Sequence, residues 1–373
     1  MSEPQVSIII PTLNEAENLP VLVPRLDEIL RGRGLKYEII VVDDDSRDET
    51  RAVCARLSEQ YPLALIVRQN IKDGLSGAVL QGMAAANGRT LVVMDADLQH
   101  PPEKVPELLA TLDAGADFAL GSRYVPGGST AERWGPLRKL NSWAATFLAR
   151  PFAGNTNDPM SGFFAFRRET YLSATRLTPL GYKIALELMC KARVKDVREI
   201  PIHFGMRERG QSKLTMKQQF RYLEHLSRLY DFTFPRASPI AKFLIGAVAG
   251  WGLAAVAYAM LLPHQGMVRA AIASYPLALA VTALFHVRYV RAQREFLATP
   301  RPWQDFWIIA MAEWTACGLV AAWWVRRADG PRPLEVFVLA FGAATVFRYM
   351  LRKEFLQDVR GLRRELRKDE LIA

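Results

Sequence analysis

The first part of the chain alternates short apolar runs with stretches of helical spacing. The apolar runs are rich in Val and Ile and stop at acidic, polar or proline residues, which is typical of buried strands. We expect these strands at residues 6–10, 37–42, 63–67 and 90–94, and helices at 14–31, 47–60 and 77–87. Strands that alternate with helices predict a mostly parallel sheet covered by helices. The sequence therefore predicts an α/β domain.

The pattern changes near residue 213. Lys213, Lys217, Arg221 and His225 recur every four positions, and apolar residues occupy the other side of the same stretch. This spacing predicts a basic amphipathic helix of the kind that lies on a membrane surface. The alternative is an ordinary surface helix that packs on the α/β domain. We favour the membrane surface because long apolar segments follow at once.

Four apolar segments in the second part of the chain are candidates for membrane spans. They cover residues 240–262, 270–287, 306–325 and 336–347. The last segment is short for a span. Glu313 lies inside the third segment, and an acid inside a span usually has a partner. We expect it to pair with Arg348, directly after the fourth segment; the alternative is a locally hydrated acid near a helix end.

Composition favours a membrane protein over a nucleic-acid-binding one. The 373 residues carry a net charge of +10, which fits either nucleic acid or anionic lipid and phosphate ligands. The long apolar segments decide in favour of membrane and phosphate. The three cysteines are far apart in the sequence, which disfavours a zinc site and fits a reducing compartment.

Charge also predicts the orientation in the membrane. Residues 1–5 lead directly into the first expected strand without a signal peptide, so the α/β domain is expected in the cytoplasm. Four spans then place the arginine-rich loop at 288–301 and the basic tail on the same side, as the positive-inside rule requires. Arg326, Arg327 and Arg332 would lie on the other side, against the rule. The loop at 288–301 and the basic tail are the larger groups of charge, so we let them determine the orientation and predict a multi-pass membrane protein.

Polar and acidic residues follow three of the expected strands. They lie at residues 14–15, 43–46 and 95–99. The carboxyl ends of parallel strands share one edge of a sheet, so we expect a single ligand site there. Asp95, Asp97 and Gln99 offer the oxygen ligands that Mg²⁺ or Mn²⁺ takes beside substrate phosphates. Among the three acids at 43–45, we expect one to cap the following helix and another to face the ligand.

Basic side chains beside Gly or Ser complete the candidate site. Arg123 follows Gly-Ser, Arg138 precedes a second cation, and an Arg-x-x-Gly-x-Ser-Lys element runs from Arg207 to Lys213. Arginine binds phosphate oxygens through its planar fork, and lysine acts as a point charge. Together with the acidic cluster, these cations predict a site that holds more than one phosphate group.

Six blocks of the sequence occur in the order that one known family shows. The blocks are PTLNE (11–15), VVDDDS (41–46), DADLQHPPE (95–103), GSRYVPGG (121–128), DPMSGF (158–163) and IPIHFGMRERGQSKL (200–214). Together they resemble the polyprenyl (dolichyl) phosphate mannosyltransferases, inverting family 2 glycosyltransferases of GT-A fold, over about residues 5–235. The second part resembles the four-helix GtrA-type membrane domain fused to some members. The implied division is a GT-A domain at 1–212, an interfacial helix at 213–237, a four-span domain at 238–351 and a basic cytoplasmic tail at 352–373.

The resemblance also implies roles for individual residues. The family's nucleotide pocket for the donor corresponds to Pro11, Leu13, Glu15, Val41 and Asp43. The family's metal and diphosphate site corresponds to Asp95, Ala96, Asp97 and Gln99, and the cations of its mobile loop correspond to Arg207 and Lys213. The groups that hold the acceptor phosphate in the family correspond to Arg123, Arg138 and Ser142. The implied catalytic residues are Asp95, Asp97, Arg207 and Lys213. Two positions depart from the family: Leu13 stands where an aromatic residue is common, and Asp45 where glycine is common.

The implied reaction passes mannose from GDP-mannose to polyprenyl phosphate at the bilayer, with Mg²⁺ or Mn²⁺, giving a β-linked lipid-phosphate sugar. A phosphate monoester is largely ionised at neutral pH because its second pKa is about 6, so it needs no strong general base. One alternative is a glucosyltransferase that uses UDP-glucose. Another is a non-catalytic membrane protein for lipid-linked sugars. A third alternative is a processive polysaccharide synthase. Such enzymes usually have a Q-x-x-R-W-type element, which residues 218–222 match only weakly.

Overall fold

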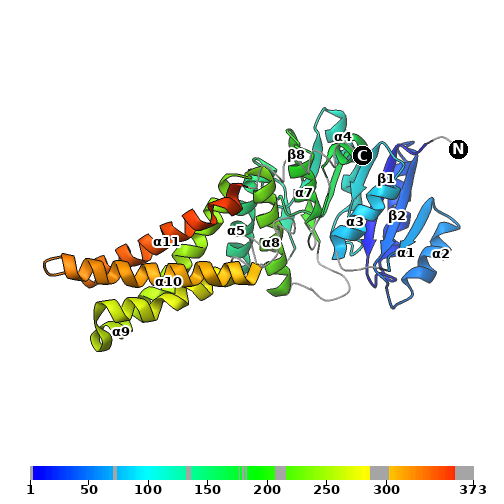
Figure 1. Cartoon of the computed structure of the whole chain (residues 1–373). Coiled ribbons are helices and arrows are strands. Elements are labelled where there is room, and N and C mark those ends of the chain that lie inside the picture. The colour runs from blue at the N-terminus through cyan, green and yellow to red at the C-terminus, as the bar shows by residue number, and fades with distance from the viewer. Residues whose placement is uncertain are drawn as a thin grey trace. The chain divides into compact units, whose positions relative to one another are not determined.

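The computed structural model describes residues 3–69, 74–131, 136–175, 177–178, 180, 183–205, 216–285 and 302–357. The chain forms two compact units, Met1–Leu229 and Tyr230–Ala373 (Figure 1). The first unit is an α/β domain, and the second consists of long helices. The boundary between them falls inside helix α8 (Met216–Thr233).

A seven-stranded sheet forms the centre of the first unit, in the order β3-β2-β1-β4-β7-β5-β8. Its strands are β1 (Val6–Thr12), β2 (Tyr37–Asp43), β3 (Leu63–Val67), β4 (Thr90–Val93), β5 (Phe118–Ser122), β7 (Phe164–Arg167) and β8 (Val197–Pro201). Strand β7 runs antiparallel to β4 and β5, and the other neighbouring pairs are parallel. The four expected strands and the mostly parallel sheet confirm the predicted α/β fold of GT-A type.

Helices pack around this sheet, and the domain also contains a second sheet of two short strands. The helices are α1 (Leu19–Arg31), α2 (Thr50–Ser58), α3 (Gly74–Ala85), η1 (Pro102–Lys104), α4 (Val105–Asp113), α5 (Pro136–Ala153), α6 (Arg168–Ser173) and α7 (Ile184–Lys191). The second sheet pairs β6 (Ser129–Thr130) with β9 (His203–Phe204) in parallel. Helices α1 and α2 begin later than predicted, because the residues before them form the loops of the candidate site.

The central strands are buried on both faces, which explains their continuous apolar sequence. Ile8, Ile9 and Ile10 of β1 are all fully buried, so successive side chains face two covered sides of the sheet. Helix α3 covers one side at very close range. A Cβ on Gly82 would lie 2.5 Å from Ile9 Cγ2, and only glycine allows this approach.

Helix α8 packs on the α/β domain and also exposes an aromatic side chain. The Tyr222 hydroxyl donates a 2.9 Å hydrogen bond to a backbone carbonyl of α5. His225, predicted on the polar face, is buried 3.2 Å from the Glu187 carboxylate of α7. That expectation for His225 is wrong, because its ring pairs with a buried acid. Phe220 remains half exposed on the same helix.

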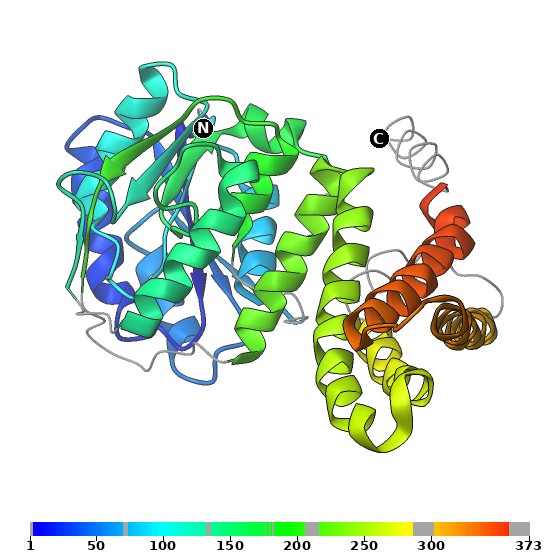
Figure 2. The same ribbon diagram turned by 90° about the vertical axis from the view of Figure 1, so that its left-hand side faces the viewer.

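The second unit contains three helices that are long and apolar enough to span a membrane, within the described residues. They are α9 (Ala237–Phe285), Trp307–Arg327 of α10 (Pro302–Arg327) and Pro333–Leu351 of α11 (Pro333–Gln357). Helix α9 is interrupted at Gly266, whose φ is 71°, and the chain folds back there (Figure 2). A Cβ on Gly250 would lie 2.9 Å from the Ala278 carbonyl oxygen, so the two halves pack side by side. The four predicted apolar segments are thus the two halves of α9, α10 and α11.

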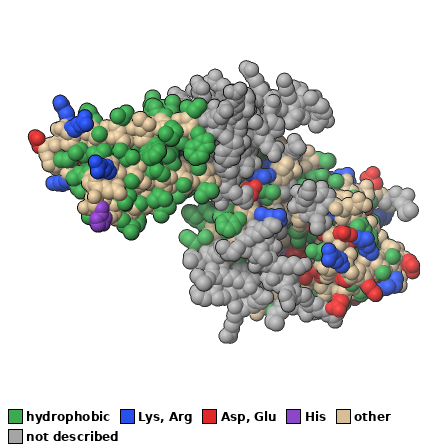
Figure 3. Space-filling model, turned by 60° about the horizontal axis from the view of Figure 1, so that its bottom comes forward, with side chains coloured by type: hydrophobic (Ala, Val, Ile, Leu, Met, Phe, Trp, Pro, Cys, Tyr) green, Lys and Arg blue, Asp and Glu red, His purple; other side chains and the backbone are tan. Residues whose placement is uncertain are grey.

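Apolar side chains are exposed along these helices (Figure 3). Exposed examples are Val248, Val256, Met260, Leu319 and Trp323. Soluble proteins rarely expose apolar surface on this scale. Helices whose backbone groups bond internally can instead present such a surface to lipid. The second unit is therefore suited to a bilayer.

A buried ion pair joins α10 and α11. Arg348 Nε donates to Glu313 Oε2 at 2.8 Å, and Arg348 Nη2 donates to the Tyr275 hydroxyl of α9 at 3.2 Å. The side chains of Glu313 and Arg348 are 0% and 2% exposed. The predicted pairing is confirmed, and it explains how both charges are tolerated among apolar helices.

Reversing either charge of this pair should destabilise the second unit, because a buried ion then faces a like charge. We expect Glu313→Arg and Arg348→Glu each to cost about 3–5 kcal/mol of unfolding free energy, the usual cost of breaking a buried pair. The double variant should recover most of that loss. Thermal unfolding of the full chain in detergent measures this, and a double variant no more stable than the single ones would contradict the pairing.

Candidate active site

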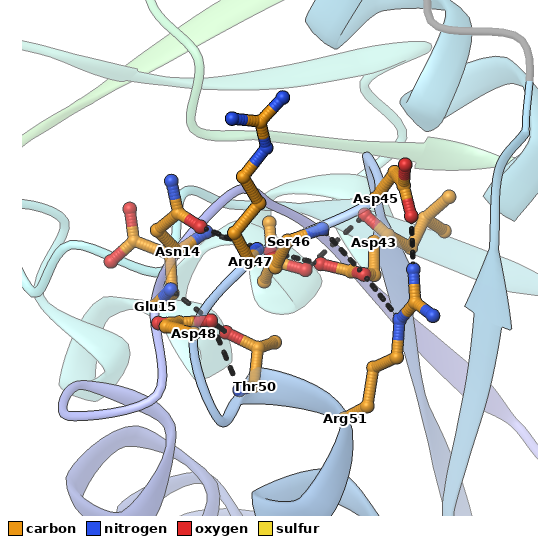
Figure 4. Close-up of polar contacts among 11 residues, drawn as sticks. Asn14, Glu15, Asp43, Asp45, Ser46, Arg47, Asp48, Thr50 and Arg51 are labelled. Atoms are coloured by element: carbon orange, nitrogen blue, oxygen red, sulfur yellow. Dashed lines mark hydrogen bonds and ion pairs between the residues drawn. The ribbon is translucent and has the colours of Figure 1, made fainter.

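Hydrogen bonds join the loops that follow β1 and β2 (Figure 4). The N–H of Asn14 donates to Ser46 Oγ at 2.7 Å, and Asn14 Oδ1 accepts the N–H of Arg47 at 2.9 Å. The N–H of Glu15 donates to Thr50 Oγ1 at 3.0 Å. Asn14 has a φ of 59°, which asparagine tolerates because its short side chain can bond locally. The two loops therefore form one connected surface at the carboxyl ends of their strands.

Asp43, a predicted donor-binding residue, is fully buried at the end of β2. Its carboxylate accepts the N–H of Ser46 at 3.0 Å and also the hydroxyl of that residue. Arg51 Nε lies 3.5 Å from the same carboxylate, and the other end of its guanidinium pairs with Asp45. Asp45 stands where the resembling family commonly has glycine, and its φ of 56° lies in the region that favours glycine.

The acid that bonds the start of α2 is not one of the three expected. Asp48 Oδ1 accepts the N–H of Thr50 at 3.0 Å, and its Oδ2 accepts the N–H of Ala16 at 3.1 Å. Asp44 pairs with the buried Arg68 at 2.5 Å instead. The prediction that an acid at 43–45 caps the helix is wrong, because those acids hold the preceding loop.

The other predicted donor-binding residues lie along the same edge of the sheet. Pro11 and Val41 are buried within β1 and β2. Leu13 is 40% exposed and offers an apolar surface beside them. Glu15 Oε2 accepts the side-chain amide of Asn18 at 2.6 Å, which orients its carboxylate.

The Asp95–Gln99 motif follows β4 after a single residue, Met94. The Asp95 side chain is one-third exposed, whereas Asp97, Gln99 and the intervening Ala96 are buried. Asp97 Oδ1 accepts the N–H of Gln99 at 3.2 Å, and Gln99 Nε2 donates to the carbonyl of Gly205 at 3.0 Å. Asp95 is thus the most open carboxylate of the motif.

His100 supports this motif from below the surface. Its Nδ1 accepts the N–H of Asp95 at 3.2 Å, and its ring stacks on Phe163 at 5.3 Å between centroids. Burial lowers the pKa of His100 to about 4, and the positive charge of Arg123 adds to that shift. The imidazole is therefore neutral near pH 7. This role of His100 could not be predicted from its sequence context.

Arg123, predicted to hold the acceptor phosphate, is bound to a buried acid. Its Nε and Nη2 each donate to Asp158 at 2.7 Å, and the Asp158 side chain is 1% exposed. Glu199 in β8 holds the backbone of the Asp158 loop, accepting the N–H groups of Asn157 and Asp158 at 2.8 and 2.9 Å. The guanidinium also lies 5.2 Å from the Phe204 ring centroid, a cation–π distance.

Ser142 is a further residue predicted to hold the acceptor phosphate. Its Oγ lies 3.1 Å from the hydroxyl of Tyr124, the residue that follows Arg123. The side chains of the remaining predicted cations lie outside the described residues: Arg138, Arg207, Lys213 and Lys217.

Lys183 is a cation of this cluster that the sequence analysis missed. It directly precedes α7, and its Nζ donates to the Met160 carbonyl at 2.6 Å. Burial and, to a smaller extent, the positive charge of Arg123 lower its pKa to about 7, while Asp158 and Asp95 oppose the shift. Its Gly-Tyr-Lys context carries no pattern that would have marked it as a site residue.

The donor set suits a hard divalent cation. In the part of the chain that the structure describes, no group of three His, Cys, Asp or Glu side chains could hold a metal ion by itself. Asp95 and Asp97 supply two carboxylates, and Gln99 supplies an amide whose nitrogen already bonds Gly205. Mg²⁺ is commonly held by one or two carboxylates plus substrate phosphates, so these residues fit the ion.

Comparisons with known proteins identify similar chains. The family model for glycosyl transferase family 2 matches residues 7–172. A dolichol-phosphate mannosyltransferase of Pyrococcus furiosus is 45% identical over 66% of this chain and 69% of its own length. One of Mycosarcoma maydis is 42% identical, over 65% and 85% of the two chains. An undecaprenyl-phosphate mannosyltransferase of Micrococcus luteus is 35% identical, over 57% and 88%.

Removing the charge of Asp158 should destabilise the first unit. Asp158→Asn leaves the largely buried Arg123 guanidinium without its carboxylate, and we expect a loss of about 3 kcal/mol of unfolding free energy. Asp196→Asn breaks an exposed pair with Arg198 and should cost about 1 kcal/mol or less. Denaturant unfolding of both full-length variants measures this; equal losses would contradict a structural role for the buried pair.

His100 should make stability depend on pH. The unfolded histidine has a pKa near 6.5 and the folded one about 4, so the unfolded chain binds more protons between these values. Stability present above pH 6.5 is therefore lost as the pH falls towards 4, by roughly 3 kcal/mol in all. His100→Asn keeps an acceptor for the Asp95 N–H and should show a flatter profile. Parallel unfolding curves for the two proteins would contradict this.

Proposed function

The chain belongs to the dolichol-phosphate mannosyltransferases of glycosyl transferase family 2, and we propose that it transfers mannose from GDP-mannose to a polyprenyl phosphate. The proposal rests on one observation. The open carboxylate of Asp95 lies at the carboxyl edge of the sheet within electrostatic reach of two cations, Arg123 and Lys183. Such a mixture of acid and base suits a diphosphate on one side and a phosphate monoester on the other.

The acceptor supplies its own nucleophile. A phosphate monoester is mostly dianionic near pH 7, so its oxygen can attack the anomeric carbon without a general base. The bond from that carbon to the diphosphate breaks as the new bond forms, and attack opposite the leaving group inverts the centre. His100 is consistent with this route, because its Nδ1 already accepts the Asp95 N–H.

The leaving diphosphate requires most of the catalytic stabilisation. Asp95 and Asp97, with the Gln99 amide oxygen, would hold Mg²⁺ or Mn²⁺. When bound, the ion would supply positive charge to the departing diphosphate. Arg207 and Lys213 would add cations to the same group, as the resemblance implies. The hydrogen bonds of Asp97 and Gln99 would keep this set in place before the donor arrives.

The donor base would occupy the edge formed by the β1 and β2 loops. Leu13 offers an apolar face, and Asp43 and Glu15 lie along the same connected loops. Val41 and Pro11 form the buried floor of that edge. A UDP-sugar donor is the second candidate, because Leu13 replaces the aromatic residue that is common in the family.

The acceptor requires a membrane surface. Helix α5 exposes Trp143 and Phe147, stacked with centroids 5.7 Å apart, and α8 exposes Phe220 and Leu223. Aromatic side chains of this kind favour the membrane–water interface. We assign these exposed side chains to the bilayer surface, residues 238–351 to four spans, and the α/β domain to the cytoplasmic side.

Activity with matched donors tests the proposal. Full-length protein in detergent would receive polyprenyl phosphate, Mg²⁺ or Mn²⁺, and either GDP-mannose or UDP-glucose, with nucleoside diphosphate and glycolipid both measured. We expect turnover with GDP-mannose only. Asp97→Ala should reduce turnover roughly 100-fold or more, the usual effect of removing one electrostatic group from such a site. Asp113→Ala, an exposed acid on α4, is the control.

Three outcomes would contradict the proposal in different ways. Turnover with UDP-glucose alone would replace the donor with that of the second candidate. Full activity of Asp97→Ala would remove the metal and diphosphate assignment. A folded protein that turns over neither donor would favour a non-catalytic membrane role.

A further inference from the structure

Lys183 is one of the two cations near Asp95, but the reaction steps described above give it no contact with either substrate. Its side chain interacts electrostatically with Arg123, Asp158 and Asp95, and its Nζ donates to the Met160 carbonyl at 2.6 Å. The same lysine also lowers the pKa of the buried His100. Lys183 is therefore close to the residues that surround the open carboxylate of Asp95.

One loop contacts both Lys183 and Asp95. The loop at 158–163 supplies Asp158 to Arg123 and the Met160 carbonyl to Lys183. It then packs on the metal motif, since a Cβ on Gly162 would lie only 3.2 Å from Asp95 Oδ2. The lysine, the arginine and the acid are thus held by consecutive parts of the same short segment.

Helix α7 fixes the backbone that carries the lysine. One turn after Lys183, the buried Glu187 carboxylate accepts the N–H of Thr178 at 2.7 Å and lies 2.6 Å from Lys191 Nζ. Its other oxygen lies 3.2 Å from His225 of α8. A lysine at the start of an anchored helix has far less freedom than a surface lysine.

The charges of the cluster favour an anion. Asp158 pairs with Arg123 through two hydrogen bonds, and the Lys183 side chain lies within electrostatic reach of both residues and of Asp95. Placing a second cation in a partly desolvated site costs free energy, which a bound anion recovers. Phosphate oxygens are the anionic groups that the reaction brings to this point.

We propose that Lys183 is a further phosphate-binding residue of the reaction centre, donating from its ammonium group to a substrate phosphate oxygen. The inference rests on the proposed function for the identity of the substrates. The phosphate belongs either to the lipid acceptor or to the donor diphosphate, and the two arms of the test separate these sources.

The test compares Lys183→Met and Lys183→Arg with Lys104→Met, a partly exposed lysine that pairs with Glu107 at the start of α4. Initial rates of the full chain would be measured with polyprenyl phosphate varied at saturating GDP-mannose, and then the reverse. Calorimetric binding of GDP and of farnesyl phosphate adds a readout that does not need turnover. Thermal unfolding reports whether each variant is folded.

We expect Lys183→Met to weaken one ligand roughly 10- to 100-fold, the contribution of one charge-assisted hydrogen bond. A change confined to farnesyl phosphate and to the KM of the lipid assigns Lys183 to the acceptor. A change confined to GDP and GDP-mannose assigns it to the donor. Lys183→Arg should keep part of the affinity, and Lys104→Met should match the unaltered protein.

Unchanged affinities and rates in folded Lys183→Met would overturn the inference while leaving the proposed function intact. A loss of thermal stability with both affinities unchanged would also overturn it, since it would show a purely structural lysine. If the unaltered protein bound the probes but turned over neither donor, the proposed function would fail, and the binding data would still decide the role of Lys183.

Discussion

The ion pair between Arg123 and Asp158 connects the parts of the catalytic unit that must meet. Arg123 follows β5, Asp158 belongs to the loop before β7, and Glu199 in β8 holds that loop by its backbone N–H groups. Three neighbouring strands are therefore tied together at one end of the sheet. The loop continues to Gly162, which packs on Asp95. The geometry around the Asp95 carboxylate thus depends on the buried ion pair between Arg123 and Asp158.

Much of the fold could be predicted because burial on two faces leaves a continuous apolar signature. The strands at 6–10, 37–42, 63–67 and 90–94 all occur where that signature predicts them. Helix starts were less predictable, since they depend on particular hydrogen bonds. Asn14 bonds the Ser46–Arg47 segment and Asp48 bonds the N–H of Ala16, so residues with helical spacing form loop contacts instead. Periodicity carries no information about such contacts across more than 30 residues.

The residues of the candidate site also differ in whether they could be predicted from the sequence. The sequence predicted the place of Asp95, Asp97 and Gln99 from their position after a strand, and it predicted the pairing of Glu313 because a charge among apolar residues needs a partner. Lys183 and Glu199 gave no such indication. Each acquires its role from a loop that lies more than 20 residues away in the chain, and nothing in its immediate neighbours reveals that contact. The partner of His225 was missed for the same reason.

The reversal of α9 at Gly266 has a consequence for the way the chain enters the resulting hairpin. Gly246 lies level with Phe285 of the returning half, because a Cβ on that glycine would be 3.2 Å from the phenylalanine ring. Residues 237–245 form about 14 Å of helix before that contact. Lys242 in this stretch pairs with Asp231 at 2.7 Å, within the second unit. The first turns of the hairpin are thus tied by an ion pair to the residues just before them, so the direction in which the chain enters the hairpin is set by a side-chain contact as well as by the helix backbone.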